Sequence, residues 1–454
     1  MPTLHTDGEH RSGNESSPAL KLFSELDMLA PAHPRPDSIP QWNIATRFVF
    51  RMWVVFFAIC LLPRSLAFAD VRLWRRMTDA LGRWPMTHLL GLPQHSWAHP
   101  MSGADYLPDF IAAAVLASFS VVIAITWSLV DRRVSHPRLF AWVYTTARFG
   151  LAALLLFYAW DKILPGQFGD GINLEKVTQP SLQLSPMALL WAFMSASRPY
   201  TIFCGLMEFV GGVLLLARRT AILGSVLSTA AMANVLMLNV GYDVSVKFIA
   251  GAMFLMALVL FAPHAKQLWK FFILHQPTTL APLPPLFIDA RRDLVARAIG
   301  VMLAVGVMYW AYGRALRIVD ENVMAAESPF YGAWTVQQTM RNGGVVLPLL
   351  TDQTIWRRLV FPFGDGAVIA VSMSDSTTQY LSKVDQAARR IDFLPWPESA
   401  AVSNQHEAYQ FNFVDREHLE LRSLTETGTG TMVRLRRDDP STYPLVAHTH
   451  TWTW

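Results

Sequence analysis

The side chains best placed to do chemistry are ionisable groups inside long apolar segments. Glu208 lies about ten residues from the nearest charge on either side, within the stretch 198–247. At a rise of ~1.5 Å per residue, a membrane helix would place this carboxylate near the bilayer midplane. An unpaired charge at that depth costs at least about 3 kcal/mol, so it must be protonated, paired or turned towards protein. Two roles stay open: an acid that exchanges protons or contacts a quinone, and a structural partner of Lys247, Arg148 or Asn234.

Four further polar residues are candidates for binding a ligand near Glu208. Arg148 and Lys162 suit an anionic ligand or a lipid head group, although long basic side chains also reach the membrane interface without binding anything. Asn234 and Asn239 are five residues apart, which is roughly 140° around a helix. They are therefore not expected to share one ligand on a straight helix face, and at least one is predicted to bond to a neighbouring helix.

Asp243 and Lys247 are the last two candidate ligand-binding residues. Their i, i+4 spacing predicts an ion pair on one helix face, and Asp243 also suits the N-terminus of a helix. Two more imidazoles, His448 and His450, lie on one face of an expected strand. Without a third ligand they do not predict a metal site, and the alternating Thr/His/Trp pattern favours a strand that closes a barrel.

The composition is that of a membrane protein with a soluble part. Hydrophobic residues make up 52% of the 454 residues and charged residues only 16%, against roughly 25% charged in soluble domains. The net charge is only +4, and the arginines flank apolar runs, so we expect no nucleic-acid partner. Cys60 and Cys204 fall in apolar runs and form no CxxC pair, which argues against a disulfide, a dithiol redox centre and a zinc knuckle.

Hydropathy predicts about seven membrane-spanning helices and one shorter apolar helix. The spans are expected at 46–68, 106–130, 139–164, 200–217, 221–240, 244–263 and 294–316, with the short helix at 186–194. Most Lys and Arg residues fall in alternate turns, which the positive-inside rule makes cytoplasmic. This orientation places the C-terminal part on the outer side of a bacterial inner (cell) membrane, in the periplasm.

Five regions follow from these patterns. They are a disordered cytoplasmic tail (1–44), two N-terminal spans joined by an amphipathic outer loop (45–138), a four-helix membrane core (139–270), a Pro-rich connector with the seventh span (271–318) and a β-rich outer domain (319–454). The outer domain contains short alternating runs separated by turn residues, which predict an up-and-down meander closing into a barrel. Gly332-Ala-Trp334 is similar to the Gly-x-Trp start of lipocalin-like barrels.

Residues 139–270 resemble the DoxX-like membrane proteins. The resemblance depends on Arg148, Tyr158-Ala-Trp-Asp-Lys162, Gln167-Phe168, Trp191-Ala-Phe-Met194, Glu208-Phe-Val-Gly-Gly212, Arg218-Arg219-Thr220, Asn234, Asn239 and Tyr242-Asp243-Val-Ser-Val-Lys247. The longer members have two extra N-terminal spans and a β-rich C-terminal domain with a motif like 351–358. The family name comes from a subunit of a quinone-coupled oxidoreductase, so the resemblance implies a four-helix core and a link to quinone.

Two functional hypotheses result. In the first, the chain is a component of a quinone-linked oxidoreductase, in which Glu208 exchanges protons and Arg148 or Lys247 stabilises the anion of the reduced quinone. Electrons would come from a partner, since the sequence has no haem, flavin or iron–sulfur motif. In the second, the chain is not an enzyme: its bundle binds lipid and its β-domain docks a protein partner or an apolar ligand.

Overall fold

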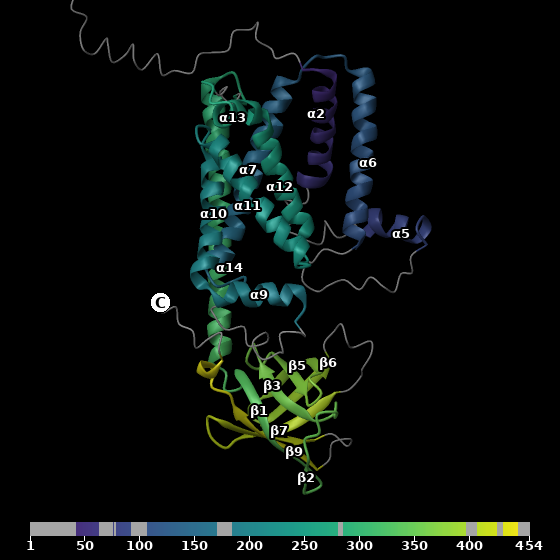
Figure 1. Ribbon diagram of the computed structural model, residues 1–454, viewed down its shortest axis with the longest axis vertical. Coiled ribbons are helices and arrows are strands. Elements are labelled where there is room, and N and C mark those ends of the chain that lie inside the picture. The colour runs from purple at the N-terminus through teal and green to yellow at the C-terminus, as the bar shows by residue number, and fades with distance from the viewer. Residues whose placement is uncertain are drawn as a thin grey trace, which may run out of the picture.

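A bundle of apolar helices stands above a small β-barrel in this computed structural model (Figure 1). The structure describes residues 42–62, 76, 79–91, 107–169, 184–279, 285–395, 406–424 and 430–443. The predicted tail, most of the loop 70–105 and the segment 448–454 lie outside these residues. Within them, seven helices are long and apolar enough to cross a membrane, as the hydropathy pattern predicted.

The long helices run along the bundle in alternating directions, and shorter helices join them (Figure 1). They are α2 (Ile44–Phe56, continued by a π-helical turn Phe57–Leu61), α6 (Leu107–Val130), α7 (Pro137–Ile163), α9 (Pro186–Ala196), α10 (Arg198–Leu216), α11 (Ala221–Gly241), α12 (Lys247–Phe261), α13 (Ala265–Phe272) and α14 (Ala290–Glu327). A π-helical turn (Asp79–Arg83) and α5 (Trp84–His88) precede α6, and a 3₁₀ turn (Ala262–His264) joins α12 to α13. The short helix α9 lies across the barrel-facing end of the bundle (Figure 1).

Four helices within 139–270 form the centre of the bundle. Helix α10 packs between α7 and α11, and α12 contacts both α7 and α11. Close approach of α7 and α10 depends on glycine, since a Cβ at Gly205 would lie 2.9 Å from the Ala159 carbonyl oxygen and one at Gly212 would lie 3.2 Å from that of Ala152. Small residues at a helix–helix interface let the two backbones approach closely, which is how apolar helices pack in a membrane. These contacts fix which faces of α7 and α10 oppose each other.

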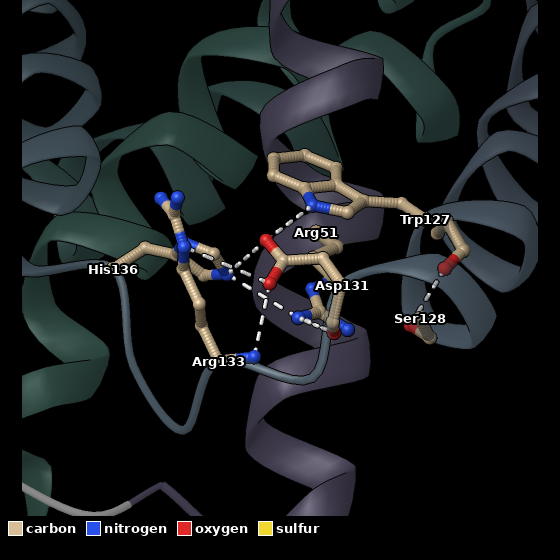
Figure 2. Close-up of polar contacts among 7 residues, drawn as sticks. Arg51, Trp127, Ser128, Asp131, Arg133 and His136 are labelled. Carbon is tan, nitrogen blue, oxygen red and sulfur yellow. Dashed lines mark hydrogen bonds and ion pairs between the residues drawn. The ribbon is translucent and has the colours of Figure 1, made fainter.

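The two N-terminal helices are tied to α7 at the end of the bundle away from the barrel. Arg51 of α2 is buried and donates from Nη2 to the Asp131 carbonyl oxygen at 2.8 Å, and the same nitrogen lies 3.3 Å from His136 Nε2. Trp127 Nε1 donates to Asp131 Oδ2 at 3.1 Å. Figure 2 shows these side chains converging on the turn between α6 and α7. The ends of three helices are therefore joined by one polar cluster.

This cluster should make stability depend on pH. Burial lowers the pKa of His136 below its ordinary 6.5, and nearby Arg51 and Arg133 add to this, while Asp131 opposes it. The unfolded chain therefore takes up the proton more readily, so stability is complete above about pH 6.5 and falls as the pH drops from there towards the folded-state pKa. In thermal unfolding measured in detergent, the unfolding temperature should fall less on acidification for His136→Gln than for the wild type. Equal losses would remove His136 from the explanation.

Helix α14 is longer than its apolar part. The hydropathy pattern ends at Leu316, yet the helix continues to Glu327, because residues 317–327 include no Gly or Pro and several strong helix formers. Its 38 residues extend ~57 Å, against ~30 Å for the hydrocarbon of a bilayer. Arg314 in its lower half forms an ion pair with Asp161 of α7. The helix thus leaves the bundle before the chain enters the barrel.

The C-terminal domain is a closed antiparallel barrel, as predicted, and it has eight strands. Strand β1 pairs with β3 along one edge and with β9 along the other, while the short β2 extends β1 as a hairpin. Aromatic and aliphatic side chains together fill the interior, and Trp334 Nε1 donates to the Phe330 carbonyl oxygen at 2.8 Å. The strands are β1 (Gly332–Arg341), β2 (Gly344–Val346), β3 (Trp356–Phe361), β4 (Ala367–Ser372), β5 (Thr377–Asp385), β6 (Arg390–Pro395), β7 (Glu407–Phe413), β8 (His418–Ser423) and β9 (Thr431–Arg437).

Two details of the barrel differ from the sequence expectation. Strands β5 and β6 were not predicted, because the exposed and polar residues of Thr377–Asp385 hide the apolar alternation that marks a strand. The barrel is closed by β9 pairing with β1. The terminal segment 448–454 was expected to supply the closing strand, and that segment lies outside the described residues.

Candidate functional site

A buried ion pair joins α7 to α10. Lys162 Nζ donates to Glu208 Oε2 at 2.9 Å, and the two residues are only 7% and 3% exposed. Tyr158, one turn earlier on α7, places its ring 5.8 Å from the same ammonium. The structure thus selects Lys162 as the partner of Glu208, in place of Lys247, Arg148 or Asn234. Pairing is one of the three states that the sequence allowed for Glu208, beside protonation and orientation towards protein.

The pair lies at the wall of an apolar cavity of about 310 Å³. Helices α7, α9, α10, α11 and α12 and the residues after α7 all contribute to its lining. Most lining side chains are apolar, and Tyr158, Gln167, Tyr200, Asn234 and Asn239 join the ion pair as its polar members. A mainly apolar pocket with a few placed polar groups is typical of a site for a small amphipathic ligand.

Short-range contacts hold the barrel-facing end of this cavity. Trp191 Nε1 of α9 donates to the Gln167 carbonyl oxygen at 3.1 Å, and Arg198 Nη1 donates to the Lys162 carbonyl oxygen at 3.1 Å. Phe168 packs edge-on against Trp191, with ring centroids 5.1 Å apart. These contacts place α9 across the end of the cavity, close to the ion pair.

One lining group has no hydrogen-bond partner among the described residues. The side-chain oxygen of Gln167 is buried and accepts no hydrogen bond from any part of the chain that the structure describes. A buried polar atom without a partner costs about 1–3 kcal/mol, so such groups are rare unless a ligand or water completes them. Gln167 therefore adds a free hydrogen-bonding group to the cavity that holds Lys162 and Glu208.

Both candidate asparagines line the cavity, contrary to the geometric expectation. Asn234 and Asn239 are separated by roughly 140° on α11, yet both belong to its wall. The cavity covers more than one face of the helix near its barrel-facing end, so residues on different faces can reach it. Asn239 also lies with Nδ2 3.5 Å from the Val246 carbonyl oxygen, a long contact towards the start of α12.

Arg148 lies elsewhere. Its Nη1 donates to the carbonyl oxygens of Leu215 at 2.8 Å and Leu216 at 3.3 Å, at the C-terminus of α10. Fourteen residues separate it from Lys162, or ~21 Å along α7, which puts it at the opposite end of the core. It lines a separate small hollow with Arg218, Asp293 and Arg297. The expectation that Arg148 acts beside Glu208 is therefore replaced by a role in satisfying unpaired carbonyls at a helix end.

We expect Arg148→Leu to lower thermal stability without changing what the cavity at Glu208 binds. The change leaves two helix-terminal carbonyls without their donor and should cost about 1–3 kcal/mol. Thermal unfolding in detergent measures the first effect, and mass spectrometry of any molecule retained by the purified protein measures the second. A variant that folds normally but loses its retained molecule would place Arg148 back in the site.

Asp243 and Lys247 form the predicted i, i+4 ion pair, with Lys247 Nζ 2.6 Å from Asp243 Oδ1. Asp243 is in the left-handed region (φ 51°), and Val246 is the N-cap of α12, so the capping interpretation of Asp243 is not what the structure shows. The Asp243 side chain is 81% exposed. Neither residue lines the cavity described above.

The described residues include no group of three or more His, Cys, Asp or Glu side chains arranged to hold a metal. The arrangement around Lys162 and Glu208 can instead donate and accept hydrogen bonds and exchange a proton, because a carboxylate and an ammonium in contact can share one. This chemistry suits a molecule with a polar, protonatable head and an apolar tail.

Comparisons with known proteins give one relative by sequence and one neighbour by structure. No family model matches the chain. An uncharacterised protein of Bacillus subtilis, YwoB, is 30% identical over 118 residues, which cover 25% of this chain and 72% of that protein. A lipocalin-like protein from Bacteroides uniformis aligns with 24% of this chain and all of its own length, at 15% identity and a TM-score of 0.18.

Proposed function

We propose a function from the site of this chain, because the chain belongs to the family of the Bacillus subtilis YwoB protein, which is uncharacterised. In this proposal the chain is a multi-pass membrane protein that binds an amphipathic, quinone-like molecule beside Lys162 and Glu208. The observation that carries this proposal is the buried 2.9 Å ion pair at the wall of an apolar cavity of about 310 Å³. A purely structural pair would need no cavity next to it.

Charge distribution supports insertion in a bacterial inner (cell) membrane with the barrel outside. Basic residues gather at the end of the bundle away from the barrel, in the turns before α7, between α10 and α11 and at the start of α14. The positive-inside rule makes that end cytoplasmic. An alkaline phosphatase fused after Trp454 should be active, because this enzyme works only outside the cytoplasm. Activity of a cytoplasmic reporter at the same position would overturn the orientation.

A quinone fits the residues that line the cavity. Apolar side chains from five helices match an isoprenoid tail. The Lys162 ammonium and the Asn234 amide N–H can donate to the carbonyl oxygens of a quinone, and the Gln167 side-chain oxygen can accept from a hydroxyl of the reduced quinol. When bound, a quinone would supply two-electron chemistry coupled to protons, with a partner protein as electron donor. In this proposal Glu208 is the group that exchanges protons with the quinone, and the hydrogen bond from Lys162 holds the Glu208 carboxyl in place.

The first test is mass spectrometry of a solvent extract from the purified protein, with an oxidised-minus-reduced absorption spectrum of the same sample. We expect about one quinone per chain in the wild type and loss of quinone-linked turnover in the folded fraction of Glu208→Gln, whose amide oxygen can still accept the Lys162 hydrogen bond although it carries no charge. Asp243→Asn is the matched control, because it removes an exposed carboxylate of the other ion pair. Phospholipid alone with a flat spectrum would favour a non-catalytic lipid-binding protein whose barrel docks a partner.

A further inference from the structure

A second, larger cavity of about 890 Å³ lies between α7 and α14. It is separate from the cavity at Glu208 and shares no lining residue with it. Small residues line it on both helices, Gly150 and Ala153 on α7 and Ala296 and Ala304 on α14, and their short side chains leave space between the two helices. We call this space the α7–α14 groove.

A close contact between α7 and α14 borders the α7–α14 groove. A Cβ at Gly300 would lie 2.5 Å from the Phe149 ring, so α14 touches α7 closely at that point. At the end away from the barrel, Trp142 of α7 meets Phe287 edge-on, with ring centroids 5.5 Å apart. The groove runs from Arg291 to Val307, or ~24 Å along α14. One leaflet of hydrocarbon is ~15 Å thick, so the groove is long enough for an acyl chain.

Two arginines line the end of the groove away from the barrel. Arg291 and Arg292 are exposed, and neither side chain has an ion-pair partner among the residues that the structure describes. The nearby carboxylates are already bound. Asp293 pairs with Arg218 and Arg297 at 3.2 Å each, and Asp289 accepts the Arg292 backbone N–H at 2.8 Å. The end of the groove therefore keeps excess positive charge.

We infer that the α7–α14 groove binds an anionic phospholipid, with an acyl chain lying along Gly150, Ala296 and Ile299 and the phosphate at Arg291 and Arg292. The combination of a long apolar channel with two unpaired guanidinium groups at its polar end matches the charge and shape of such a lipid. The inference rests on the membrane insertion proposed above. It is independent of the molecule bound at Lys162 and Glu208.

The test is a titration of delipidated full-length protein in detergent, followed by native mass spectrometry. The probes are phosphatidylglycerol and phosphatidylcholine with the same acyl chains. We expect the wild type to prefer phosphatidylglycerol, and Arg291→Gln with Arg292→Gln to bind it roughly 30-fold more weakly. Phosphatidylcholine should be weakened less, because its cationic choline offsets the charge of its phosphate, so the preference between the two lipids should be reduced or lost. The matched control, Lys266→Gln with Lys270→Gln, removes two charges from α13 at the same end of the bundle and should leave the preference intact.

A second variant tests the groove without touching the charges. Ala296→Phe fills the channel and should weaken both lipids while Arg291 and Arg292 remain. The inference fails if the double arginine variant binds phosphatidylglycerol like the wild type, if the wild type shows no preference, or if Ala296→Phe has no effect. Glu208→Gln should leave this binding unchanged, so failure of the quinone proposal and failure of the lipid site are distinguishable.

Discussion

Lys162→Met and Glu208→Leu should each destabilise the bundle strongly when made alone, whereas the double variant should recover most of the stability. Each single change leaves one charge buried without its partner, which costs about 3–5 kcal/mol. Replacing both groups by apolar side chains removes the two desolvation costs together, and such exchanges are often neutral. Both Lys162 and Glu208 are buried, so the loss of one partner should have a large effect on stability.

Thermal unfolding in detergent, followed for all three variants, measures the coupling between the two residues. The matched control is Lys247→Met, which breaks the exposed Asp243–Lys247 pair and should cost no more than about 1 kcal/mol. All three variants of the buried pair should also lose the quinone that we propose for the wild type, including the stable double variant. A double variant that stays as unstable as either single variant would mean that the two residues do not act as a pair.

This stability and binding profile separates the two roles that the sequence left open for Glu208. A purely structural carboxylate would give a stable double variant with full retention of the bound molecule. A site residue gives a stable double variant with an empty cavity. Stability and retention must therefore be measured on the same preparations.

The depth of Glu208 was predictable, but its partner was not. The spacing of charges along 198–247 is enough to place the carboxylate deep in an apolar helix. Lys162 is 46 residues away on another helix, and it meets Glu208 because Gly205 and Gly212 set how α10 crosses α7. Crossing geometry depends on packing of whole faces, which a single sequence does not reveal.

The same limit explains the misplaced Arg148 and the asparagines. Arg148 and Lys162 share one face of α7, so their residue types suggested one site, although the length of the helix separates them. Asn234 and Asn239 were predicted not to share a ligand, because a ligand was assumed to touch only one face of the helix. The cavity instead surrounds part of α11 at the helix end, so both residues line it. Helices and the barrel follow from local pattern, and a cavity follows from the space left between elements.

Gly205→Val is expected to break the site from a position that lines no part of the cavity. A Cβ there would lie 2.8 Å from Ile163 Cγ1, 2.9 Å from the Ala159 carbonyl oxygen and 3.0 Å from Lys162 Cβ. Overpacking of this kind costs about 1–3 kcal/mol or more, and the helices can relieve it only by moving apart. Because Lys162 and Glu208 lie on the two opposed faces, their contact should be lost, and the bound molecule with it.

Gly306→Val is the matched control, because a Cβ at Gly306 of α14 would meet nothing within 4 Å. It should change thermal stability and retention of the bound molecule only slightly. Ile163→Ala added to Gly205→Val removes the nearest side-chain clash, but the Ala159 carbonyl is backbone and cannot yield, so rescue should be partial. Full retention in Gly205→Val alone would show that α7 and α10 tolerate separation. The site would then depend on the cavity walls of α11 and α12 more than on the Lys162–Glu208 contact.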